Sequence, residues 1–175
     1  MGFSGLPVRY LAQMARAVEV DTVLSWGHYT LLNDELNDEL VPLARQKGFG
    51  LLNAAPLMQR ILSDAPIPAW QNAPQPVKDL QPQLNAVCRE YGVALSDVAL
   101  RFALDHPVVA TTIVGMNTAR QVEQNARVLD FQIPDGLLDR LASLVAPVKN
   151  QMWFEGKPEN NLPKNGSVER HPDSL

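Results

Sequence analysis

A polar turn at residues 115–118, Gly-Met-Asn-Thr, is the part of the sequence best suited to bind an anion. An apolar, β-branched run at residues 109–114 precedes it and predicts a strand buried on both faces. Asn117 or Thr118, with Gln121 in capping-box position, predicts the start of a helix. The turn thus joins a strand's carboxyl end to a helix's amino end, where backbone N–H groups and the helix dipole favour a phosphate. The alternative is a βα turn without a ligand, because this connection is common to α/β folds.

Side chains that could act as acids, bases or nucleophiles are not grouped by any motif. His28 and Tyr29 follow a predicted strand, but no Lys or Asp is placed with them, and His28 is interpreted as a packed or pocket-wall residue. His106 precedes Pro107 at the end of a predicted helix and is interpreted as a helix stop, and His171 lies in the tail. We therefore predict no catalytic residue and no metal site within this chain.

The composition is that of a globular protein without a nucleic-acid or membrane surface. The 175 residues are 46% hydrophobic and 19% charged, with a formal net charge of −4, and the basic residues form no stripe. No apolar run is long enough to span a bilayer, and the first residues do not resemble a secretion signal. The single cysteine, Cys88, excludes an internal disulfide and is interpreted as a packed core residue in a reducing compartment. We therefore expect a cytoplasmic protein.

Strands and helices alternate along the chain. Apolar runs predict strands at residues 1–4, 22–26, 49–55 and 109–114, and helical spacing predicts helices at 7–19, 36–47, 83–91, 96–104, 118–129 and 134–145, with a proline-rich loop at 57–76. Pro42 leaves the first turn of the helix at 36–47 undecided, because an interior proline breaks the hydrogen-bond ladder. Other expected details are a helix cap at Ser96 and a buried stripe of Val122, Ala126 and Leu129. This α/β alternation predicts a parallel sheet, doubly wound or barrelled. A closed (β/α)8 barrel takes about 250 residues, so residues 1–148 would form about half of one and 149–175 a tail.

Seven segments of the sequence, in their order and spacing, resemble the second half of the aldo-keto reductase family. They are GFSGLP, DTVLSWGHYTLLN, GLLNAAPL, PAW, GVALSDVALRFAL, IVGMNTARQVEQN and EGKPEN, and they cover residues 2–161. Among the branches of the family, the L-galactose and L-fucose dehydrogenase group is the most similar. The resemblance implies a (β/α)8 TIM barrel with a nicotinamide cofactor at the carboxyl ends of its strands. The strands of this chain would be the fifth to the eighth, followed by an appended helix.

The resemblance also implies a set of cofactor-binding positions. Ser4 and Ser25 match positions that hold the nicotinamide carboxamide, Ala54 the ring-stacking position, Pro56, Leu57 and Met58 the pyrophosphate loop, Gly115, Met116 and Asn117 the adenosine phosphate segment, and Gln121, Gln124 and Asn125 the following helix. Trp26, Trp153 and Phe154 are the local candidates for a substrate wall. The match departs from the family at four of the positions from Ser4 to Arg60. Gly5 stands where an Asn is common, Ser25 where a Gln contacts the amide, Ala54 where many members place a stacking Tyr, and Arg60 replaces a small residue.

The cofactor predicted by the resemblance is NAD, with NADP less favoured. NADP-dependent members place a Lys at the position of Gly115 and an Arg at that of Gln121, because a phosphate dianion needs charge-assisted partners. Neither cation is present in this sequence, although Arg120 lies beside the second position.

The family's catalytic Tyr, Lys, Asp and His lie on strands two to four, which would precede Met1. Because the chain begins inside a predicted strand, we expect a truncated NAD(P)-dependent sugar dehydrogenase that lacks the catalytic tetrad and is inactive alone. Its substrate would be a small aldose or aldehyde. The alternatives are a non-catalytic nucleotide- or partner-binding half-barrel, and another barrel enzyme in which residues 115–117 hold a substrate phosphate.

A half-barrel would leave two strand edges open, at residues 1–4 and 109–114. Val23, Leu51 and Ile113 are expected to point into the barrel, where their packing partners would be absent. Since an unpaired strand edge is a template for association, we expect self-association.

Overall fold

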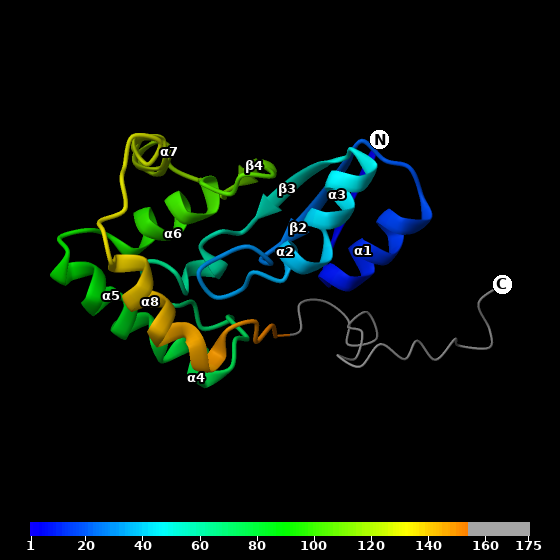
Figure 1. The fold of residues 1–175 in the computed structure, drawn as a ribbon. Helices are drawn as coiled ribbons and strands as arrows, with labels where there is room; N and C mark the ends of the chain where they lie inside the picture. Colours follow the sequence, from blue (N-terminus) through cyan, green and yellow to red (C-terminus); the bar gives the residue numbers. More distant parts are fainter. Residues whose placement is uncertain (154–175) are drawn as a thin grey trace.

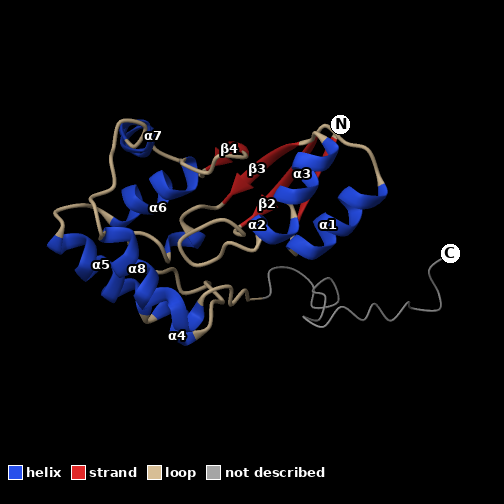
Figure 2. Cartoon of the chain, viewed as in Figure 1, coloured by secondary structure: helices blue, strands red, loops and turns tan. Residues whose placement is uncertain are grey.

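The computed structural model describes residues 1–153 and contains one parallel sheet with helices around it (Figure 2). The four strands are β1 (Gly2–Gly5), β2 (Thr22–Trp26), β3 (Gly50–Ala54) and β4 (Val109–Ile113), hydrogen-bonded in the order β1-β2-β3-β4. Every neighbouring pair is parallel. The predicted α/β alternation and parallel sheet are therefore confirmed, and within the described residues β1 and β4 are the two edge strands.

Eight α-helices and two short 3₁₀ turns connect or follow these strands in the described part of the chain. They are α1 (Val8–Ala17), α2 (Leu36–Glu39), α3 (Val41–Lys47), η1 (Met58–Arg60), α4 (Gln75–Lys78), α5 (Leu80–Glu90), α6 (Leu95–Leu104), α7 (Ala119–Arg127), α8 (Leu137–Val145) and η2 (Ala146–Val148). None of these helices is long and apolar enough to cross a membrane. Figure 1 shows α1, α2 and α3 beside the sheet, and α4, α5 and α8 gathered farther from it.

One face of the sheet is covered by the first three helices. Val23 of β2 and Leu51 of β3 are paired in register, and both are fully buried in a cluster with apolar residues of α1, α2 and α3. The expectation that these two side chains point into the barrel is therefore wrong. Side chains alternate between faces along a strand, and here the apolar sides of the helices cover the face that carries Val23. Leu24 and Leu52, paired in register, occupy the other face and are half-buried.

A second apolar cluster lies away from the sheet. It joins the loop after β3 to α4, α5, α6 and α8, with Leu84, Leu95, Leu137 and Leu141 fully buried. Cys88 belongs to this cluster and is 1% exposed, and burial raises the pKa of its thiol to about 11. The interpretation of Cys88 as a packed core residue is confirmed.

The unit formed by β4 and α7 is much less buried than predicted. In β4 only Val109 and Thr112 are even half-buried, and α7 contains no buried residue. Val122 is 50% exposed and Leu129 is 64% exposed, so the expected buried stripe is wrong. The reason is topological, because β4 is an edge strand and the described chain places no second neighbour beside it.

Several helix ends differ from the sequence prediction for local reasons. Ser96 does not cap α6, which begins at Leu95. Instead Asp64 accepts hydrogen bonds from Leu95 N at 3.3 Å and from Ser96 Oγ at 3.1 Å. The last helix begins at Leu137, after Gly136 with φ 75°, and not at Pro134.

The predicted helix at 36–47 is divided into α2, which ends at Glu39, and α3, which begins at Val41 and carries Pro42 in its first turn. Gly48 ends α3 in the left-handed conformation with φ 78°, as the sequence predicts.

Candidate functional site

Two cavities that share Trp26 and Gln59 lie at the carboxyl ends of the four strands, and together they are called the cleft below. The larger cavity, of about 560 Å³, is lined by Trp26, Ala55, Pro56, Leu57, Gln59, Arg60, Val114, Gly115, Met116, Asn117 and Gln121. The smaller cavity, of about 290 Å³, is lined by Ser4, Gly5, Leu6, Leu24, Trp26 and Gln59. The turns after β1, β3 and β4 therefore contribute to one site, as expected for ligands of parallel α/β sheets.

The structure brings many of the predicted cofactor positions to this cleft. Those that line it are Ser4, Pro56, Leu57, Gly115, Met116, Asn117 and Gln121, together with the predicted substrate-wall residue Trp26. Those that do not line it are Ser25, Ala54, Met58, Gln124, Asn125 and Trp153, and Phe154 lies outside the described residues.

Ser25 is directed away from the cleft because it lies on the helix-covered face of the sheet, two residues after Val23, where it joins a buried polar group. It is fully buried, and its Oγ lies 2.9 Å from His28 Nδ1. Burial lowers the pKa of His28 to about 4, so its imidazole is neutral at pH 7. Asn53, the register partner of Ser25, donates from Nδ2 to the Tyr29 carbonyl at 2.9 Å. This group fixes the turn after β2, which confirms that His28 is a packed residue.

His106 also has a structural position. Its Nδ1 accepts hydrogen bonds from the backbone N–H groups of Val108 and Val109, both at 3.1 Å, and its Nε2 lies 2.8 Å from Asn37 Oδ1. The imidazole therefore holds the turn between the end of α6 and the start of β4, which agrees with its interpretation as a helix stop.

Other predicted positions have partners outside the cleft. Met58 is fully buried, with its sulfur 3.1 Å from the place where a Cβ on Gly27 would lie. Trp153 is 7% exposed and belongs to the second apolar cluster. Gln124 donates from Nε2 to Asp97 of α6 at 3.2 Å, which connects α7 to α6.

The loop after β3 enters the cleft in an unusual backbone conformation. Ala55, Met58, Gln59 and Arg60 have positive φ values of 59°, 45°, 53° and 78°. Non-glycine residues in this region cost of order 1–3 kcal/mol each and cluster at ligand sites. The loop is held by Gln81, whose Nε2 donates to the carbonyls of Arg60, Ser63 and Ala65 at 2.8, 3.0 and 2.9 Å.

Sequence reasoning did not select Ala55, Gln59 or Arg60 as site residues. Gln59 lines both cavities and Arg60 lines the larger one. A run of left-handed residues is normally signalled by Gly or Asn, and residues 55–60 contain neither. The conformation arises from contacts with distant residues such as Gln81, and no local signal could have revealed it.

The electrostatic character of the cleft is that of an anion site. Among the described residues that line it, Arg60 is the only charged one, and none is a Tyr, His, Lys, Asp or Glu. The amino end of α7 also faces the larger cavity, since Asn117 and Gln121 line it. Thr118 Oγ1 caps this helix by accepting from Gln121 N at 3.2 Å, and Gln121 Oε1 accepts from Asn117 N at 2.9 Å. The predicted helix cap is therefore confirmed.

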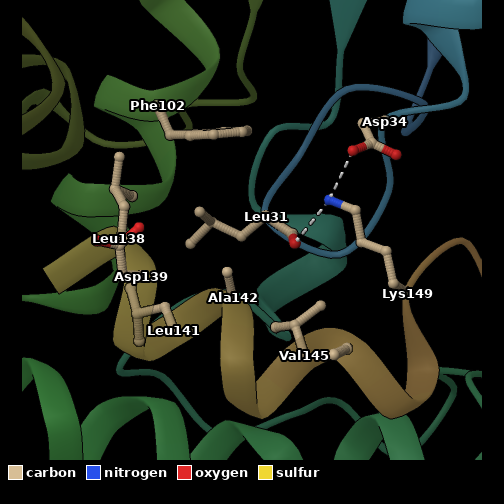
Figure 3. Close-up of a pocket in the computed structure, with 10 residues that line it drawn as sticks. Leu31, Asp34, Phe102, Leu138, Asp139, Leu141, Ala142, Val145 and Lys149 are labelled. Atoms are coloured by element: carbon tan, nitrogen blue, oxygen red, sulfur yellow. Dashed lines mark hydrogen bonds and ion pairs between the residues drawn. The ribbon is translucent and has the colours of Figure 1, made fainter. Parts of the chain in front are cut away.

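A third cavity, of about 430 Å³, lies between α6, α8 and the turn after β2 (Figure 3). Its wall is largely apolar, with Leu31, Phe102, Leu141 and Val145 among the lining residues. At its rim, Lys149 Nζ forms an ion pair with Asp34 Oδ2 at 3.2 Å and donates a hydrogen bond to the Leu31 carbonyl at 3.4 Å. Among residues 1–153, no strand residue lines this cavity, and the one cation that lines it, Lys149, is already paired. The cleft is therefore the better candidate for an anionic ligand.

Comparison with known families gives a match over most of the chain. The aldo/keto reductase family model matches residues 1–146. This range contains all four strands, the helices from α1 to α8, and every residue that lines the cleft.

Curated relatives of the chain are dehydrogenases. L-galactose dehydrogenase of Arabidopsis thaliana is 29% identical over 167 residues, which cover 91% of this chain and 52% of the relative. Pyridoxal 4-dehydrogenase of Microbacterium luteolum is 31% identical over 130 residues, covering 71% and 38%. D-threo-aldose 1-dehydrogenase of Pseudomonas sp is 25% identical over 147 residues, covering 81% and 45%. The chain thus spans about half or less of the length of these relatives.

Proposed function

Because this chain belongs to the aldo/keto reductase family, whose members use nicotinamide cofactors, we propose that the cleft is the cofactor site of a dehydrogenase. The four parallel strands and their helices are part of the family's (β/α)8 barrel. The observation that carries the proposal is the placement of Arg60 and the amino end of α7 on the same cavity. A cation and a helix amino end together suit the pyrophosphate of a dinucleotide.

The rest of the cleft also fits such a cofactor. Trp26 and Leu57 offer apolar surface for a ring, and Ser4 in the smaller cavity offers a hydroxyl for a carboxamide. No atom lies within 4 Å of a Cβ built on Gly115, so a phosphate can approach the backbone there. Ala54 is 8% exposed and contributes no aromatic surface, so Trp26 is our candidate for contact with the nicotinamide.

A bound nicotinamide supplies the hydride acceptor or donor of the reaction, and the residues of this chain bind and orient it. The cleft lining includes no general acid in the part of the chain that the structure describes. General acid–base catalysis contributes about 10²–10⁴ in rate. We therefore propose that residues 1–153 bind the cofactor but lack the catalytic tetrad, and that the chain alone has no measurable dehydrogenase activity.

The substrate that we propose is a small aldose or aldehyde. The names of the relatives support this class, since two of them are sugar or aldose dehydrogenases and the third acts on pyridoxal. Trp26 is the wall residue that we propose for it, and Trp153, being packed in the second apolar cluster, is not.

NAD is the cofactor that we propose in preference to NADP. Gly115 and Gln121 line the larger cavity without a charge, and Gln121 already uses its Oε1 for Asn117 N. A 2′-phosphate therefore lacks charge-assisted partners at both positions.

The location that we propose is the cytoplasm. Cys88 is the only cysteine of the sequence, and its buried free thiol suits a reducing compartment.

Self-association through the edge strands is a further part of the proposal. Ile113 on β4 is 46% exposed, and Val122 on α7 is 50% exposed. Both belong to the unit of β4 and α7, and β4 has only β3 as a hydrogen-bonded neighbour in the described chain. An unpaired strand edge and exposed apolar side chains favour association. Light scattering after size-exclusion chromatography would report oligomers that Val122→Glu reduces, whereas a monodisperse monomer would refute self-association.

The second candidate function is a non-catalytic nucleotide- or partner-binding half-barrel. It is favoured by the same observation that removes catalysis, namely the absence of an acid or base among the described residues of the cleft lining. An assay of dehydrogenase activity distinguishes the two functions. Only the dehydrogenase proposal predicts that activity is present once a general acid is supplied to the cleft.

Titration of the 175-residue chain with NADH, followed by nicotinamide fluorescence, tests the cofactor site. Removing the charge with Arg60→Gln is expected to weaken NADH about tenfold, because a hydrogen bond to a charged group contributes about 1.5–3 kcal/mol. Arg89→Gln, at the exposed end of α5, is the matched control and is expected to bind normally. Absence of NADH binding by the unmodified chain, or equal affinity of the Arg60→Gln variant, would contradict the proposal.

A further inference from the structure

Two glutamine side chains connect the proline-rich loop to the cleft. Gln71 is 2% exposed and lies behind the cleft lining. Its Oε1 accepts from the backbone N–H of Ala73 at 2.8 Å, and its Nε2 donates to Gln59 Oε1 at 2.7 Å. Gln59 is half-buried and lines both cavities of the cleft. A residue outside the cleft is thus hydrogen-bonded to the residue at its centre.

The chemistry of these bonds fixes the direction of both amides. A backbone N–H can only donate, so the Gln71 atom that faces Ala73 must be the oxygen. The other end of Gln71 is then an NH₂ group, which can only donate, so the Gln59 atom that faces it must also be an oxygen. The NH₂ group of Gln59 is consequently the end that is left for a ligand.

The backbone conformation of Gln59 and Arg60 makes the position of the Gln59 side chain depend on its contacts with Gln71. Gln59 and Arg60 both have left-handed φ values, 53° and 78°. Gln71 Nε2 also lies 3.5 Å from the carbonyl of Met58, the first residue of η1. Gln71 therefore contacts both the backbone and the side chain of the segment that forms the middle of the cleft.

We propose that Gln71 is a positioning residue that fixes Gln59 as a hydrogen-bond donor into the cleft, toward an acceptor oxygen of a phosphate-bearing ligand. This inference rests on the proposed function and deepens it. Arg60, the next residue, lines the same cavity and supplies the positive charge that a phosphate oxygen requires. The acceptor belongs either to a dinucleotide or to a free pyrophosphate, and the two sources share this chemistry.

An isosteric substitution inverts the arrangement without altering any residue of the cleft. In Gln71→Glu, at a pH where the new carboxyl group is ionised, one carboxylate oxygen still accepts from Ala73 N, and the other can only accept. Gln59 must then turn its NH₂ group toward residue 71, and its oxygen faces the ligand. A donor in the cleft becomes an acceptor, which repels a phosphate oxygen.

The binding experiment uses the 175-residue chain with NADH and, separately, inorganic pyrophosphate. Gln71→Glu is expected to weaken the bound probe about tenfold, and Gln59→Ala is expected to weaken it similarly. In the Gln59→Ala background, Gln71→Glu is expected to weaken binding much less, because the residue that it turns is gone and only the added charge remains. Gln83→Glu, which adds the same charge on the exposed surface of α5, is the control and is expected to bind normally.

The inference is overturned if Gln71→Glu leaves affinity unchanged, or if it weakens binding equally with and without the Gln59 side chain. A loss of NADH affinity with normal pyrophosphate affinity in Gln71→Glu would also overturn it, since the acceptor would then not be a phosphate oxygen. A thermal melt of each variant identifies any loss of affinity that comes from unfolding. If Gln71→Glu is unfolded, Gln59→Ala alone tests whether the Gln59 side chain donates to the ligand.

A measurement without ligand separates this inference from the proposed function. In ¹⁵N-labelled protein, the side-chain NH₂ protons of Gln59 are expected to exchange quickly in the unmodified chain and slowly in Gln71→Glu, where they are hydrogen-bonded. No change in their exchange would overturn the positioning role even if NADH binds. The expected change together with no binding of either probe would retain the positioning role and refute the cofactor site.

Discussion

The β3 and β4 strands have the same length and direction, yet they differ in how the rest of the molecule covers them. Leu51 on β3 is fully buried under α1, α2 and α3, whereas Ile113 on β4 is 46% exposed. β3 has a hydrogen-bonded neighbour on each side, and β4 has only β3 in the described chain. Figure 1 shows the same contrast for the helices, with α1 and α3 close to the sheet and α7 at a distance from it.

This difference shows that burial is a property of neighbours and not of composition. The run from Val109 to Ile113 is as β-branched as any interior strand, and on that basis it predicts a strand covered on both faces. The cover must come from other elements, and the described residues supply little of it. The cleft lies where the two regions meet, between the loop after β3 and the turn after β4.

The largest expected effect is on stability. Leu51→Ala removes a fully buried side chain from the cluster of α1, α2 and α3, and should lower the free energy of unfolding by about 2–5 kcal/mol. Ile113→Ala should lower it by about 1 kcal/mol or less, because nearly half of that side chain is exposed. Urea denaturation of both variants checks the comparison. Equal losses would show that β4 is covered in solution.

The second prediction concerns pH and the buried group behind β2 and β3. Burial lowers the pKa of His28 from 6.5 to about 4 in the folded protein, so the unfolded chain binds a proton first as the pH falls. The contribution of neutral His28 to the free energy of unfolding is therefore present in full above pH 6.5, and it is lost progressively as the pH falls to about 4. At 1.36 kcal/mol per unit the loss is about 3 kcal/mol.

Denaturation at pH 7.5 and 4.5 measures this loss, and His28→Asn should make the free energy of unfolding less dependent on pH. Burial also lowers the pKa of His106, which contributes in the same direction and is retained in the variant. An unchanged pH dependence in His28→Asn would mean that His28 is solvated in the folded protein.

The third prediction tests the uncharged turn after β4. The double variant Gly115→Lys and Gln121→Arg should raise NADP affinity about tenfold or more while changing NAD affinity little, because a hydrogen bond to a charged group contributes about 1.5–3 kcal/mol. Space for the new side chain at position 115 is present, since no atom lies within 4 Å of a Cβ there. Equal affinity of the unmodified chain for NAD and NADP would contradict the reasoning and would identify Arg120 as a partner of the 2′-phosphate.

The smallest expected effect is local to α7. Thr118→Ala removes the hydroxyl that accepts from Gln121 N, and a lost helix cap costs about 1 kcal/mol. Because α7 buries none of its residues, the loss should appear as faster amide exchange within α7, with the urea midpoint of the protein unchanged. A shifted midpoint would show that α7 is coupled to the rest of the fold.

The sequence predicts most of the fold because the relevant signals are local. The apolar runs of β2 and β3, Gly48 at the end of α3 and the Thr118 cap all depend on residues close in the chain. The family resemblance adds the barrel and the position of the cleft. The strand order and the family match confirm the fold, and the cofactor site stays a prediction.

The sequence does not predict features that depend on distant partners. Ser25 lies on the helix-covered face with Val23, two residues earlier on β2, so the face of the strand that the helices α1 to α3 cover decides its position. Gln59 reaches the cleft because Gln71 and a left-handed backbone hold it there. Val23 and Leu51 face the helices because strand register decides the face, and a shift of one residue would reverse it.

Hydrogen exchange of the 175-residue chain, with and without saturating NADH, tests the cofactor site most directly. We predict that NADH slows exchange in residues 55–60 and 114–121, which line the cleft from its two sides, and leaves residues 137–149 of the third cavity unchanged. Inorganic pyrophosphate should slow the same two segments. No slowing in either segment, or slowing confined to residues 137–149, would contradict the assignment of the cleft as the cofactor site.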